Sequence, residues 1–131
     1  MQTSEESAKD SDFLFTFFGN DDDVKEVAIG KKGIFNTIKK NSVYIDNTTA
    51  SAKVARELHK NAKTHGFGFL DAPVSGGQAG AEKGTLTVMV GGDKEDFDKA
   101  KSIIDCYSKK VQLLGPSGSG QLAKMVNQIC I

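Results

Sequence analysis

Short apolar runs alternate along the chain with segments that have helical spacing. The apolar runs, which are typical of strands, cover residues 13–18, 42–48, 67–74, 85–92 and 110–115. The segments between them that have the pattern of amphipathic helices are residues 21–29, 50–64 and 94–107. Parallel neighbours in a sheet need a long crossover connection, so this alternation predicts an α/β fold with a mostly parallel sheet and flanking helices.

The two ends of the chain add two further expectations. Residues 4–10 could form a short helix capped by Ser4 or an irregular tail, and the pattern leaves both open. A further helix is expected to begin between Gly118 and Gly120. Its apolar positions predict a buried stripe made of Leu122, Met125, Val126, Ile129 and Cys130. Its opposite face is polar and holds Gln121, Lys124, Asn127 and Gln128.

Charge and composition exclude several classes of partner. The chain has 17 basic and 17 acidic residues among 131, so no global field favours nucleic acid or an anionic membrane surface. Cys106 and Cys130 lie far apart without metal-ligand spacing, and we expect them to be small apolar core residues and no metal to be bound. The N-terminus is polar and no apolar stretch reaches the length of a membrane span. A cytoplasmic location is the expectation.

The most informative run is Asp71-Ala-Pro-Val-Ser75-Gly76-Gly77, at the end of a predicted strand. Because glycine has no side chain, the backbone N–H groups of this turn are accessible, and the Ser75 hydroxyl adds a further donor. Such a set of donors suits a bound carboxylate. A Ser-Gly-Gly tripeptide taken alone is more often a plain turn between strands.

The longer run, with Gly80, Ala81 and the stretch 84–92 (GTLTVMVGG), is very similar to the substrate-binding signature of the β-hydroxyacid dehydrogenases, a family that includes 3-hydroxyisobutyrate dehydrogenase and tartronate semialdehyde reductase. The resemblance implies that the chain forms part of a Rossmann-like fold. It also implies oxidoreductase activity with NAD or NADP and a small carboxylate substrate. It also implies that Ser75, Gly76 and Gly77 hold the substrate carboxylate.

A second run matches the family pattern Gly-x-x-Gly-x-Gly-x-x-x-Lys-x-x-Asn from Gly115 to Asn127. A lysine on an exposed helix face is usually only solvated, although a cation near the positive end of a helix is disfavoured as a structural feature. The resemblance implies that Lys124 is the general acid and base of hydride transfer. It also implies that Asn127 helps to position the lysine and the substrate.

Two weaker likenesses concern the cofactor. Asp46-Asn47-Thr48-Thr49 resembles the family's Asp-x-Ser-Thr, which implies that Thr49 lies by the nicotinamide, although such a run also starts a helix. Phe17 and Phe18 align with a family strand end, usually Met-Leu-Pro, that contacts the cofactor; the different residues weaken that assignment. His59 and His65 are expected to be surface residues without a catalytic role.

The chain contains no Gly-x-Gly-x-x-Gly turn and no ribose-reading residue, so its sequence does not distinguish NAD from NADP. The resemblance then implies an internal fragment: residues 1–115 are the C-terminal part of a dinucleotide-binding domain, and residues 116–131 start a long interdomain helix. We expect weak or no cofactor binding by this chain alone, and no activity. A homo-oligomer is implied for the full-length family enzyme. The alternative function is a non-catalytic, dehydrogenase-like binding module or a truncated remnant.

Overall fold

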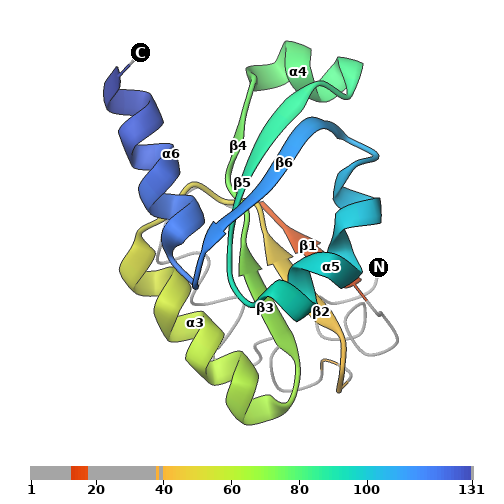
Figure 1. Cartoon of the computed structure of the whole chain (residues 1–131), viewed down its shortest axis with the longest axis vertical. Helices are drawn as coiled ribbons and strands as arrows, with labels where there is room; N and C mark the ends of the chain where they lie inside the picture. The colour runs from red at the N-terminus through yellow and green to blue at the C-terminus, as the bar shows by residue number, and fades with distance from the viewer. Residues whose placement is uncertain (1–12, 18–37, 39, 131) are drawn as a thin grey trace, which may run out of the picture.

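The computed structural model describes residues 13–17, 38 and 40–130, and Figure 1 shows their arrangement. The strands in chain order are β1 (Phe13–Thr16), β2 (Val43–Asp46), β3 (Gly68–Asp71), β4 (Val74–Ser75), β5 (Leu86–Gly91) and β6 (Ser108–Gly115). The helices are α3 (Ala52–His65), α4 (Gly77–Lys83), α5 (Lys94–Ile104) and α6 (Ser119–Cys130). The expected segments 4–10 and 21–29 lie outside the described residues. Among the helices described, none is long and apolar enough to cross a membrane.

The strands form one mixed sheet in the order β1-β2-β3-β5-β4, with β6 paired to the other edge of β5. β1, β2 and β3 are parallel, β5 is antiparallel to β3 and β4, and β6 is parallel to β5. Asp71 lies opposite Gly91, and Val74 lies opposite Val88 in the same register. β3 and β4 therefore form one strand beside β5, interrupted at residues 72–73.

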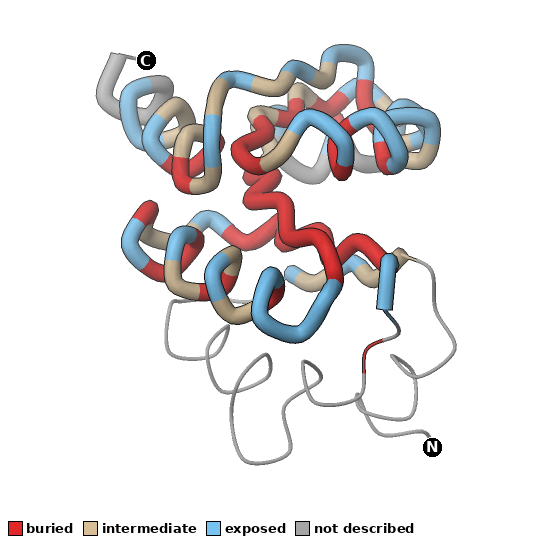
Figure 2. Tube along the Cα trace, turned by 60° about the horizontal axis from the view of Figure 1, so that its bottom comes forward, coloured by how far each residue is buried: buried red, intermediate tan, exposed pale blue. Residues whose placement is uncertain are grey.

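The core has two halves, one on each face of the sheet. Side chains alternate between the faces along a strand. Tyr44 and Phe69 pack with Leu58 of α3 on one face, whereas Ile45 and Leu70 pack with α5 on the other. Figure 2 shows the buried strands running between two helical layers whose outer sides are exposed. Because β2 and β3 are covered on both faces, every residue in them is buried.

Local signals in the sequence set the limits of α3. The Ser51 hydroxyl accepts a hydrogen bond from the backbone N–H of Val54 at 3.1 Å, which caps the first turn. Gly66 ends the helix with φ +85°, a conformation that glycine adopts without steric cost. The helix predicted at residues 50–64 is thus confirmed with a shift of one or two residues.

The fold class and the strands are confirmed, with one addition. Residues 77–83 form the short helix α4, which the sequence pattern did not predict. Gly77 and Gly80 lower the helix propensity of this segment, so its composition resembles a turn more than a helix.

The predicted buried stripe of α6 is wrong for its three members with described side chains, whereas the side chains of Ile129 and Cys130 lie outside the described part of the structure. Leu122, Met125 and Val126 are 41%, 48% and 58% exposed within the described part of the chain, and Gln121 is only 2% exposed. A Cβ atom on Gly120 would lie 2.4 Å from the carbonyl oxygen of Met89. The helix therefore meets the sheet with its glycine and glutamine side, and its apolar side faces outward.

The prediction for Cys106 is also wrong, because this residue is exposed. Cys106 lies in the turn between α5 and β6, outside the face of α5 that packs on the sheet. Its thiol donates a hydrogen bond to the carbonyl oxygen of Ser102 at 3.4 Å. The side chain of Cys130 lies outside the described part of the structure.

Candidate active site

A cavity of about 810 Å³ opens where the ends of β1, β2 and β4 approach α6. Two of the lining residues come from the Ser-Gly-Gly motif and one from the Lys-x-x-Asn motif, so the fold brings these distant segments to one space. The residues that line the cavity are Phe15, Phe17, Asn47, Val74, Ser75, Gly76, Leu86, Ile103, Cys106, Tyr107 and Lys124.

One wall of the cavity is the end of β4. Ser75 pairs with Thr87 of β5, which fixes the backbone just before the glycines. Gly76 has φ +130°, and a Cβ atom there would lie 3.2 Å from the Leu86 side chain. A residue with a side chain would be strained at this position, so the turn keeps its backbone open to the cavity. Gly77 follows as the first residue of α4.

The facing wall is α6, which contributes Lys124. This lysine is partly buried, and among the described residues that line the cavity it alone is charged. Asn47, Ser75 and Tyr107 supply the remaining polar side chains in a lining that is otherwise apolar. A single cation in apolar surroundings attracts an anionic ligand more strongly than it would in bulk water.

Of the other expected site residues, only Phe17 is among those that line the cavity in the described part of the chain. Asn127 lies one helical turn after Lys124 on α6. Phe17 lines the cavity and is 71% exposed, whereas Phe18 lies outside the described residues. Thr49 is exposed in the loop between β2 and α3 and is not among the lining residues. The roles assigned to these residues stay predictions.

A third wall, which no sequence pattern predicted, is formed by Asn47, Tyr107 and Phe15. The Asn47 amide donates to the carbonyl oxygen of Ala72 at 2.8 Å and to the Tyr107 hydroxyl at 3.4 Å. The rings of Phe15 and Tyr107 meet edge to face, with centroids 6.0 Å apart. Burial raises the pKa of Tyr107 above its usual value, and the hydrogen bond with Asn47 partly opposes this effect. No spacing rule connects residues so far apart in the chain.

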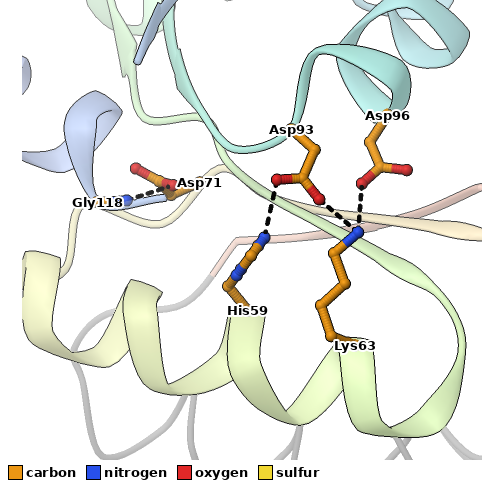
Figure 3. A network of polar contacts seen from close by, with 6 residues as sticks. All are labelled: His59, Lys63, Asp71, Asp93, Asp96 and Gly118. Atoms are coloured by element: carbon orange, nitrogen blue, oxygen red, sulfur yellow. Dashed lines mark hydrogen bonds and ion pairs between the residues drawn. The ribbon is translucent and has the colours of Figure 1, made fainter. Parts of the chain in front are cut away.

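A buried carboxylate holds the start of α6. Asp71 accepts hydrogen bonds from the backbone N–H of Gly118 at 2.9 Å and of Gln121 at 3.1 Å. Figure 3 shows the first of these contacts. Burial raises the pKa of Asp71 to about 6, although the N–H groups of Gly118 and Gln121 favour the ionised form and lower it.

Gln121 makes a second set of buried contacts, which the sequence did not reveal either. Its side-chain carbonyl accepts from the backbone N–H of Ala50 at 3.0 Å, and its amide donates to the carbonyl oxygen of Thr48 at 2.7 Å. The first turn of α6 is thereby attached to the loop that follows β2. A glutamine on the polar side of a predicted helix is normally taken as solvated, so its burial gives no signal in the sequence.

A separate polar network joins α3 to α5 away from the cavity, and Figure 3 shows it beside Asp71. Asp93 lies 3.3 Å from the Nε2 atom of His59 and forms an ion pair with Lys63, and Lys63 lies 4.0 Å from Asp96. The pKa of Asp93 is lowered, chiefly by its hydrogen bond with Lys63. His59, predicted to be a surface residue, is partly buried and bonded to Asp93, whereas His65 is exposed as predicted. Within the described part of the chain, no group of three or more His, Cys, Asp or Glu side chains could hold a metal ion.

Nearly the whole chain is similar to known oxidoreductases. Residues 1–115 match the family model described as the NAD binding domain of 6-phosphogluconate dehydrogenase. The chain is 53% identical over 129 residues to an oxidoreductase of Shewanella frigidimarina, covering 98% of this chain and 44% of the relative. It is 37% identical over 126 residues to mitochondrial 3-hydroxyisobutyrate dehydrogenase of Mus musculus, covering 96% and 38%.

A solved structure shows the same fold at comparable identity. The 3-hydroxyisobutyrate dehydrogenase of Mycobacterium tuberculosis, solved with L-serine, superposes with a TM-score of 0.92 and 32% identity. The match covers 99% of this chain and 44% of that one. The chain therefore spans less than half the length of the relatives that it matches.

Proposed function

The chain belongs to the β-hydroxyacid dehydrogenase family, whose NAD-binding domain it represents, and from this premise we propose that its cavity binds a small β-hydroxy acid or the corresponding semialdehyde for hydride transfer with NAD or NADP. Residues 1–115 would belong to the dinucleotide-binding domain and residues 116–131 to the start of an interdomain helix. The observation that carries the proposal is that Ser75 and Gly76 line the same cavity as Lys124, its one charged lining residue among those described.

The lining fits a nicotinamide ring beside a small acid. Phe15, Phe17 and Tyr107 offer aromatic surface of the kind against which a flat ring packs well. The volume of about 810 Å³ exceeds what a four-carbon acid needs. When bound, the nicotinamide supplies or accepts the hydride. Thr49, Phe17 and Phe18 remain the proposed contacts to this cofactor.

The chain's own residues then have separate tasks. Ser75, Gly76 and Gly77 hold the substrate carboxylate with hydroxyl and backbone N–H donors. Lys124 donates a proton to the carbonyl oxygen during reduction and, as the neutral amine, accepts the hydroxyl proton during oxidation. Asn127, one turn further along the helix, positions the lysine and the substrate. The apolar lining excludes water and strengthens the attraction between the ammonium group and the anion.

The proposal is tested by titrating the ¹⁵N-labelled chain with 3-hydroxyisobutyrate and following the backbone signals by NMR. We expect the signals of Ser75 and Gly76 to shift, and Lys124→Met to weaken binding about tenfold, because a hydrogen-bonded charge pair contributes roughly 1.5 kcal/mol. Lys110→Met removes an exposed lysine of β6 and is the matched control.

The uncharged amide of the same acid tests whether the carboxylate is recognised, and we expect it to bind more weakly than the acid. Equal affinity of the acid for the wild-type chain and for Lys124→Met would contradict the assignment of Lys124. Unchanged signals at Ser75 and Gly76 would contradict the carboxylate site.

A further inference from the structure

Three segments that contribute to the proposed site converge on the first turn of α6: the loop after β2, the strand β3–β4 and the glycine-rich run that starts the helix. We propose that Asp71 and Gln121 together form a positioning brace, which sets the place of Lys124 relative to Ser75. The role of this brace depends on the proposed function of the site, whereas the hydrogen bonds that form it are observed in the structure. Neither residue lines the cavity, so both act through the helix.

The Asp71 part of the brace connects the lysine helix directly to the substrate strand. Its two carboxylate oxygens bind separate N–H groups, those of Gly118 and Gln121, at 2.9 and 3.1 Å. The same residue is the last of β3, and Ser75 lies four positions later on the continuing β4. Both parts of this strand pair with β5, so Ser75 cannot shift far from Asp71. The strand β3–β4 thus carries both the Ser75-Gly76 turn and the Asp71 carboxylate that holds α6.

Because Gly91 and Gly120 have no Cβ atom, α6 can approach the sheet closely. A Cβ atom on Gly91 would lie 2.7 Å from an Asp71 carboxylate oxygen and 2.8 Å from the backbone nitrogen of Gly120. A Cβ atom on Gly120 itself would lie 2.7 Å from the Asp71 carbonyl oxygen. A carboxylate on a longer side chain, or a helix placed further out, would lose this pair of hydrogen bonds.

The Gln121 part fixes the rotation of the helix. Its side chain is bonded at both ends to the backbone of the Thr48–Ala50 loop, at 2.7 and 3.0 Å. That loop is itself held, since the Thr48 N–H donates to the carboxylate of Asp46 at 3.0 Å. Lys124 lies one turn after Gln121, on nearly the same side of the helix. Fixing the glutamine therefore directs the lysine toward the cavity.

Apolar packing cannot perform this task in the described part of the chain. Leu122, Met125 and Val126, which would normally anchor such a helix, are substantially exposed. The orientation of the first turns therefore depends on directional polar contacts. Loss of one contact should move the Lys124 amine while the fold remains intact.

The experiment compares four variants of the full chain by NMR after selective ¹³Cε labelling of lysine. The Lys124 signal is assigned from its loss in Lys124→Met. Asp71→Asn places an NH₂ group against one of the two N–H donors, and Gln121→Met keeps the side-chain volume but removes both hydrogen bonds. Asp98→Asn and Gln112→Met alter an exposed acid and an exposed glutamine, and are the matched controls.

We expect Asp71→Asn and Gln121→Met to shift the Lys124 signal and to speed hydrogen exchange at the Gly118 and Gln121 amides. Affinity for 3-hydroxyisobutyrate should fall in both variants by up to about tenfold, the loss expected for Lys124→Met, because the displaced amine no longer pairs with the acid. The Ser75 amide signal should stay in place, and both control variants should match the wild-type chain.

The possible results separate the brace from the proposed function. If the two variants are folded and leave the Lys124 signal and the affinity unchanged, the brace is refuted, even if their melting temperatures fall. If the wild-type chain does not bind the acid while the Lys124 signal moves in both variants, the brace stands and the proposed function fails. Should Asp71→Asn not fold, Gln121→Met alone decides.

Discussion

Asp71 is a carboxylate with no exposed surface, held beside the positive end of a helix. Two effects on its pKa oppose each other there. Burial disfavours the charged form, and the backbone donors of Gly118 and Gln121 favour it. Burial dominates, because the pKa rises from 3.8 to about 6. Asp71 therefore holds α6 in place, but its ionisation lowers the free energy of unfolding.

The sign of this effect gives a prediction. A carboxyl group whose pKa is higher in the folded chain favours folding below pH 4 and progressively less up to about pH 6. We expect the free energy of unfolding of the wild-type chain, compared with that of Asp71→Asn, to fall by about 2 kcal/mol between pH 4 and pH 7. Urea unfolding at several pH values measures it, with Asp98→Asn as control. A ¹³Cγ titration of Asp71 with a midpoint near pH 4 would rule the explanation out.

At the scale of the element, α6 shows how glycine spacing places a helix. Gly118 has φ +93°, and a Cβ atom there would lie 2.9 Å from the Nε atom of Arg56. Gly120 faces the backbone of β3 and β5, where a Cβ atom has no room. The family pattern of glycines before Lys124 thus corresponds to a physical need, which is close approach of the helix start to the sheet.

Substituting Gly120 tests this packing. Gly120→Ala raises the intrinsic helix propensity, but its methyl group would overlap the carbonyl oxygens of Met89 and Asp71. We expect the overlap to dominate and the free energy of unfolding to fall by about 2 kcal/mol. Leu122→Ala, at an exposed position of the same helix, should change it by less than about 1 kcal/mol. Thermal or urea unfolding compares the two, and a stabilised Gly120→Ala would show that α6 does not need this close approach.

At the scale of the whole molecule, the chain belongs to an NAD(P)-binding family but contains no Gly-x-Gly-x-x-Gly turn among its 131 residues. That turn and the helix after it receive the pyrophosphate in dinucleotide-binding folds. Under the proposed function, the cavity would receive only the nicotinamide end of the cofactor and the substrate. Its contribution to the affinity for a whole dinucleotide is correspondingly limited.

We therefore expect NADH fluorescence to change little when this chain is added, with a dissociation constant weaker than about 100 µM. No reduction of NAD by 3-hydroxyisobutyrate should be detectable at 340 nm. Micromolar affinity for NADH would contradict the expectation. Binding of the acid without turnover would favour the non-catalytic binding module for this chain. The cytoplasmic location and the homo-oligomer implied for the full-length enzyme stay predictions.

The α/β class, the family and the order of the described strands and helices other than α4 follow from the sequence alone. Hydrophobic periodicity is a local property of each helix and strand. The Ser75-Gly-Gly motif and the Lys124 motif are each one continuous run of residues. Only the tertiary structure decided which face of α6 is buried, that Asp71 holds its first turn, and that Asn47 and Tyr107 share a cavity wall. The hydrogen bonds that fix these features join residues 47 to 73 positions apart. Burial of a polar side chain is decided by the partner that it meets in space, and no local pattern encodes that partner.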